Sequence, residues 1–103
     1  MIKEILKATG LQFRRSRFLK PPAEKYAVYM DDVDTDGPDG INRIFTHNIT
    51  LEVYAPTMDE DLEAAIEAEL NTRGLRWEKQ DWHWLQTEQR YQAVYDFSYI
   101  TKN

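Results

Sequence analysis

The pattern best suited to chemistry is the acidic stretch Asp32-Val-Asp-Thr-Asp-Gly37. In a calcium loop, carboxylates at the first, third and fifth positions converge on the ion, and a glycine at the sixth allows a sharp turn. The rest of the pattern fails, because Asp39 stands where an apolar residue is expected and Arg43 where a bidentate glutamate is needed. We therefore expect an acidic hairpin tip exposed to solvent, with weak calcium binding as the alternative. Its carboxylates are those of Asp32, Asp34, Asp36 and Asp39.

Three arginines, Arg14, Arg15 and Arg17, lie between Phe13 and Phe18. Arginine beside aromatic rings is typical of surfaces on which nucleic-acid bases stack. The net charge of −5 argues against that use, since binding to nucleic acid is driven by phosphate neutralisation. An arm that meets an acidic surface of a neighbouring subunit fits the charges better. A nucleic-acid patch and a solvated edge remain as alternatives.

Histidine and cysteine give little support for catalysis or metal binding. His47 and His83 are the only histidines, and the chain has no cysteine, so disulfides and thiolate metal sites are excluded. His47 falls on the apolar face of a predicted strand, where we expect a hydrogen-bonded core residue. Neither a Ser/His/Asp arrangement nor a glycine-rich phosphate loop is present. We expect a protein that is not an enzyme and that uses no cofactor or metal.

Three tryptophans, Trp77, Trp82 and Trp84, lie within eight residues of one another. Tryptophan is enriched at interface hot spots because one side chain buries a large area. A small core capped by one or two of them is the alternative. We take Trp82 and Trp84 as candidate interface residues.

Charge is distributed unevenly along the chain. Residues 1–30 carry seven basic and two acidic residues, whereas residues 31–70 carry one basic and twelve acidic residues. Complementary patches of this kind would allow one copy to meet the next head to tail. No run of about 18 apolar residues occurs, so we expect no membrane-spanning segment.

These residues are positioned by a predicted strand over 43–55, in which apolar and polar side chains alternate. One apolar and one polar face indicate an antiparallel strand that is covered on one side only. A helix should follow over 58–72, with Thr57 and Glu60 at capping-box spacing and Gly74 as its stop. A shorter helix is predicted over 2–9, ending at Gly10.

The remaining elements are strands. Residues 26–30, 75–80 and 91–100 have strand patterns, 11–18 is a strand or an irregular arm, and 82–89 is a turn or a short strand. Residues 31–40 read as the loop of a hairpin. The 103 residues should therefore form a single α+β domain, with an antiparallel sheet of four to five strands and two helices packed on one face.

Eight short segments carry a family resemblance that covers essentially the whole chain. They are Ala8-Thr9-Gly10-Leu11, Phe18 with Pro21-Pro22, Tyr26-Ala27-Val28-Tyr29, Ile49-Thr50-Leu51-Glu52-Val53-Tyr54, Asp59-Glu60-Asp61-Leu62-Glu63, Trp77-Glu78-Lys79, Thr87-Glu88 and Tyr91-Gln92-Ala93-Val94-Tyr95-Asp96-Phe97. In this layout the chain resembles the small tail-completion proteins, also called tail terminators or tail-to-head joining proteins, of tailed phages and of prophages in Gram-positive bacteria.

The resemblance implies a structural role in the virion, at the head-proximal end of the tail, after synthesis in the cytoplasm of the bacterial host. Such proteins form a ring, typically of six copies, that stops growth of the tail tube and faces the head connector. The implied partners are further copies of the chain, the tail-tube protein and the connector or neck protein. A neck or head-closure component, or a small binding module with a calcium-responsive loop, are the alternatives.

Overall fold

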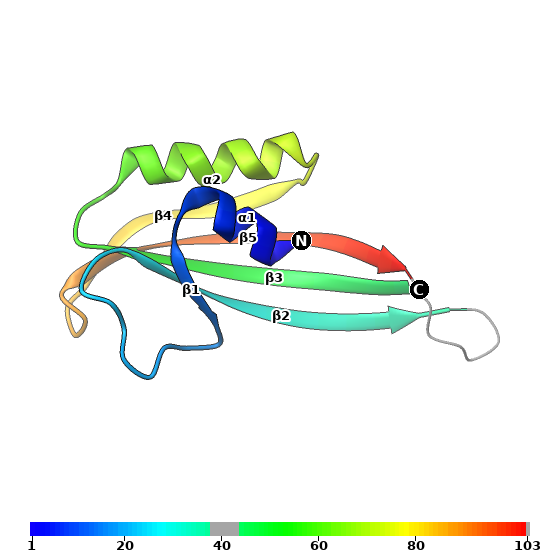
Figure 1. Ribbon diagram of the computed structural model, residues 1–103, viewed down its shortest axis with the longest axis horizontal. Helices are drawn as coiled ribbons and strands as arrows, with labels where there is room; N and C mark the ends of the chain where they lie inside the picture. The colour runs from blue at the N-terminus through cyan, green and yellow to red at the C-terminus, as the bar shows by residue number, and fades with distance from the viewer. Residues whose placement is uncertain (38–43, 103) are drawn as a thin grey trace.

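The computed structural model describes residues 1–37 and 44–102 and has an α+β fold (Figure 1). Its elements in chain order are α1 (Ile2–Thr9), β1 (Gln12–Arg15), β2 (Tyr26–Asp36), β3 (Ile44–Ala55), α2 (Glu60–Thr72), β4 (Trp77–Leu85) and β5 (Arg90–Lys102). The predicted fold class is confirmed, and the central strand lies where alternation placed it.

The five strands form one sheet in the order β1-β2-β3-β5-β4. Every neighbouring pair is antiparallel except β1 and β2, which run parallel. The sheet is therefore mixed rather than purely antiparallel. The parallel pair arises because residues 16–25 lead the chain from the end of β1 back to the start of β2.

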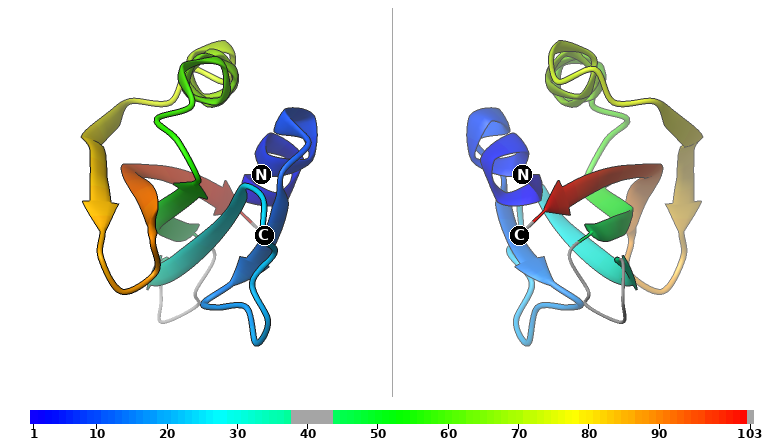
Figure 2. Two further views of the ribbon diagram at one scale, coloured as in Figure 1. Left: turned by 90° about the vertical axis from the view of Figure 1, so that its left-hand side faces the viewer. Right: turned by 90° about the vertical axis from the view of Figure 1, so that its right-hand side faces the viewer.

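Both helices cover the same face of the sheet, as the end-on views of Figure 2 show. The outer strands β1 and β4 curl upward toward the helices, so the sheet is U-shaped in these views. The helix-facing residues of β3 are buried beside apolar residues of α1 and α2, as alternation predicts. This core includes Ile5, Leu6, Ile49, Leu51, Val53, Leu62, Ile66 and Leu70. None of the described helices is long and apolar enough to cross a membrane.

The ends of the helices agree with the sequence patterns in two of three cases. Gly10 ends α1 in the left-handed conformation, with φ of 76°, and Gly74 follows α2 with φ of 69°. The predicted capping box of Thr57 and Glu60 is wrong. Instead Asp59 caps α2, since its Oδ1 accepts a hydrogen bond of 3.0 Å from the backbone N–H of Leu62. Helix α2 therefore begins two residues later than predicted.

The predicted loop over 31–40 is wrong for its first six residues, because β2 continues through Asp36. Beyond a base at which β4 still pairs with Phe97, the sheet projects as a three-stranded arm, which comprises residues 31–36, 44–49 and 97–102 (Figure 1). The β1 strand pairs only with Tyr26–Tyr29, and β4 begins opposite Phe97. The arm thus carries one edge on β2 and another on β5 that β1 and β4 do not cover.

Candidate assembly surfaces

The acidic residues lie along a strand and not around a turn. Asp32, Asp34 and Asp36 pair with Asn48, Thr46 and Ile44 of β3. They alternate with helix-facing residues, so all three lie on the face that lacks helices. We call these three residues the acid row. The fourth predicted member, Asp39, and also Arg43, lie outside the described residues.

The acid row does not have the geometry of a calcium loop. Alternate residues of a strand are spaced by about 6.6 Å, whereas calcium ligands lie about 2.4 Å from the ion. Hydrogen bonds also engage the row, since Asn48 Nδ2 donates to Asp34 Oδ2 over 3.0 Å. Within residues 1–37 and 44–102 no group of three or more acidic or histidine side chains is arranged to hold a metal ion.

The three arginines lie at the β1 edge but do not form one patch. Arg15 lies on the helix-facing side and donates to the backbone carbonyl of Asp31 over 3.1 Å. Arg14 lies on the opposite side, with its guanidinium 5.1 Å from the centre of the Phe18 ring. Arg17 follows the positive-φ residue Ser16, where the chain leaves the sheet. All three are exposed. They lie at the same edge of the sheet as the acid row, because β1 is the neighbour of β2.

The acids in and beside α2 are largely engaged within the chain. Glu63 and Glu67 both form ion pairs with Lys79 of β4, at 3.1 Å for Glu67. Glu69 pairs with Arg73, and Asp59 with Lys25. Two further acids, Glu78 and Asp81, were not singled out from the sequence. Both are exposed on β4, which forms the edge of the sheet opposite β1.

Lys79 and Tyr95 join α2 to the sheet through a half-buried polar cluster. Burial opposes the charge of Lys79, but its bonds to Glu63 and Glu67 outweigh that effect and raise its pKa. The hydroxyl of Tyr95 donates to Glu67 over 2.8 Å. Burial and this bond to a carboxylate raise the pKa of Tyr95 well above the usual range. The cluster is structural, because its charges face one another between helix and sheet.

The two candidate tryptophans have different environments. Trp82 is 8% exposed and donates from its indole N–H to Glu63, so it is part of the core and is unavailable to a partner. Trp84 is 44% exposed and packs edge-on against Tyr91, with ring centres 5.1 Å apart. A register shift in β4 between Gln80 and His83 turns both tryptophans toward the helix side. Only Trp84 remains a candidate interface residue.

His47 is hydrogen-bonded as predicted, but it lies in the arm instead of the buried core. Its Nδ1 lies 3.0 Å from the carboxylate of Asp31, and its Nε2 lies 3.0 Å from the hydroxyl of Thr101. The ring stacks on Tyr99, with centres 4.7 Å apart. These contacts tie the three strands of the arm together.

The hydrogen bonds at the end of β1 show which backbone groups of β2 face outward. The backbone N–H of Ser16 donates to the carbonyl of Tyr29, and Arg15 reaches the carbonyl of Asp31. Because backbone groups alternate in direction along a strand, those of Val33 and Thr35 face the same way. They lie beyond the last β1 pairing, so β2 presents an open edge along the arm. The same alternation can be followed across β3 to β5. There the backbone groups of Ser98, Ile100 and Lys102 face away from β3, toward the open edge.

No protein-family model matches the chain, and no curated protein matches it.

Proposed function

We propose that this protein is a structural component of a phage or prophage virion that caps the head-proximal end of the tail tube as a ring. The resemblance of its sequence to tail-completion proteins supports this role. The structural observation that supports ring assembly is the pair of open strand edges on opposite sides of the arm. A surface on one side that pairs with a different surface on the other generates a closed ring when the rotation between copies closes.

The two edges are compatible partners. Both β2 and β5 run antiparallel to β3, so they are parallel to each other, and copies related by rotation about a ring axis would pair them in parallel. Asp36, Ile44 and Lys102 occupy one transverse row of the arm. When the rows of neighbouring copies align, Lys102 of one copy lies beside Asp36 of the next. This opposite-charge pair favours the aligned register.

Charges outside the arm also favour head-to-tail packing of the subunits. Arg14 and Arg17 are exposed near β1, while Glu78 and Asp81 are exposed on β4 at the opposite edge. Head-to-tail packing brings these two edges toward each other. The arginines would therefore meet the acids of β4 of the neighbour.

A proline on the open edge of β2 tests this mode of assembly. Thr35→Pro removes a backbone N–H that faces the open edge and leaves the pairing of β2 with β3 in place. We expect the wild-type protein, mixed with the tail-tube protein, to give capped tubes of defined length in electron micrographs. Thr35→Pro should reduce the fraction of capped tubes at least tenfold.

Leu19→Pro is the matched control, since Leu19 is 88% exposed in the irregular segment between β1 and β2. It should cap tubes as the wild type does. Capping by Thr35→Pro at the wild-type level would contradict edge pairing. Failure of the wild-type protein to cap tubes, together with binding to the head connector, would instead assign it to the neck.

A further inference from the structure

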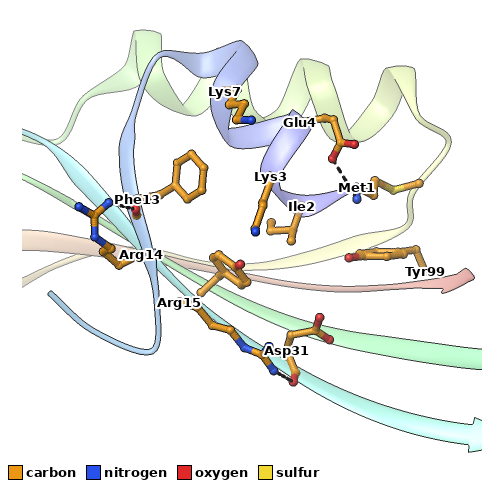
Figure 3. Close-up of a pocket in the computed structure, with 11 residues that line it drawn as sticks. Met1, Ile2, Lys3, Glu4, Lys7, Phe13, Arg14, Arg15, Asp31 and Tyr99 are labelled. Carbon is orange, nitrogen blue, oxygen red and sulfur yellow. Dashed lines mark hydrogen bonds and ion pairs between the residues drawn. The ribbon is translucent and has the colours of Figure 1, made fainter.

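A groove of about 710 Å³ lies between α1 and the β1–β2 edge (Figure 3), and of its lining residues only Arg14 also belongs to the contacts invoked for the ring. Lys3 and Lys7 of α1 line one wall, and Arg15 of β1 lines the other. In Figure 3 the side chain of Lys3 points from the helix toward β1, and Arg15 extends along β2 toward Asp31. Apolar and aromatic side chains complete the lining, namely Ile2, Phe13, Tyr29 and Tyr99.

The groove is basic although the protein as a whole is acidic. Its two carboxylates, Glu4 and Asp31, already have partners within 3.0 Å, the Met1 amine and His47 respectively. Among the described residues no carboxylate lies within ion-pair distance of Lys3, Lys7 or Arg15. The groove therefore presents cations on both walls, above an aromatic floor.

We propose that this groove binds an acidic segment of a partner protein in extended conformation. The lining reaches from β1 to β5 across three inter-strand spacings, which is about 14 Å and accommodates about four extended residues. Acidic side chains of the segment pair with Lys3 and Arg15, and an apolar or aromatic side chain packs on Phe13. Charge complementarity with opposed cationic walls selects this occupant.

The distribution of charge favours a peptide over a nucleic-acid strand. A phosphate backbone carries a charge at every nucleotide, and the net charge of −5 opposes its binding to this chain. An acidic peptide can place its carboxylates opposite the cationic walls and present backbone N–H groups to Glu4 and Asp31, whose oxygens accept hydrogen bonds. The aromatic floor suits either occupant, so the distribution of charge decides between them.

The test is a titration of the full chain with a fluorescent eight-residue peptide in which glutamate alternates with tyrosine or leucine. We expect saturable binding, detected by fluorescence anisotropy, that weakens at least tenfold in the double variant Lys3→Glu/Arg15→Glu. Amide shifts in a ¹⁵N NMR spectrum should cluster at Lys3, Phe13, Arg15 and Asp31. Dispersed spectra of the variant show that it folds.

The control variant Lys20→Glu/Arg76→Glu makes the same change in net charge at exposed sites outside the groove, and it should bind as the wild type does. An equal loss in both variants would overturn the proposal, because only the overall charge would then matter. Tighter binding of a single-stranded oligonucleotide than of the peptide would overturn the choice of occupant. The titration uses the unassembled protein, so its result is independent of tube capping.

Discussion

Tyr95 and Tyr54 are the residues whose ionisation is most altered by their surroundings. Burial raises the pKa of Tyr54 to about 12, reinforced by the carboxylate of Glu52, and raises that of Tyr95 further. A raised pKa means that the folded protein disfavours tyrosinate relative to the unfolded chain, in which tyrosine ionises near pH 10. The stability that these hydroxyls contribute is complete below pH 10 and is lost as the pH rises toward 12 and beyond.

We therefore expect the free energy of unfolding, measured with urea, to fall as the pH rises from about 10 to about 12. The rise in absorbance at 295 nm that marks the ionisation of tyrosine should occur at higher pH in the folded protein than in the unfolded protein. Tyr95→Phe should cost about 1 kcal/mol at pH 7, because Glu67 loses one donor, and should reduce the fall at alkaline pH. An unchanged alkaline fall in this variant would show that Tyr95 does not contribute to it.

For single residues, the type of contact was predicted more often than its location in the fold. His47 was expected to be hydrogen-bonded and is, but its partners come from neighbouring strands of the arm. Trp82 could not be assigned to the core from the sequence, because its direction depends on a register shift that no residue type marks. Lys79 likewise meets Glu63 and Glu67 only when β4 lies beside α2.

The sequence offers two candidate caps for the start of α2, Thr57 and Asp59, and the structure uses Asp59. Asp59 Oδ1 accepts from the backbone N–H of Leu62, which satisfies one of the free donors of the first turn. Asp59→Ala should lower the free energy of unfolding by about 1 kcal/mol, and Asp59→Asn by much less, since asparagine also caps. Urea unfolding with circular dichroism would measure both.

Thr57→Ala is the matched control and should change stability by less than about 0.5 kcal/mol, because Thr57 is exposed outside the helix. A loss of stability equal to that of Asp59→Ala would show instead that Thr57 caps the helix. Thr and Asp are both good cap residues, and only Thr57 has a glutamate three positions later, so the sequence pattern favoured the wrong residue. The length of β2 was also missed. Aspartate is depleted in strands, so the run of aspartates was interpreted as a turn.

For the molecule as a whole, sheet order determines which charges can meet, and sequence does not give that order. The basic segment and the acid row were expected on surfaces that face different neighbours, yet β1 and β2 are adjacent. The acid row then has a second consequence. Two copies that paired their open β2 edges antiparallel, centred on Asp34, would place Asp32 opposite Asp36 and Asp34 opposite itself. Like charges in directly opposed positions destabilise such pairing.

The triple variant Asp32→Asn/Asp34→Asn/Asp36→Asn should therefore form a dimer or larger species through β2, under conditions in which the wild type does not. Sedimentation velocity measures this, and high salt should shift the wild type in the same direction, because it screens the exposed carboxylates. The control Glu60→Gln/Asp61→Asn/Glu88→Gln removes three exposed acids elsewhere and should sediment as the wild type does. A triple acid-row variant that sediments as the wild type does would contradict this role of the acid row. A variant that gains the β2 dimer should also cap fewer tubes, since the same edge then pairs with the wrong partner and Asp36 no longer attracts Lys102.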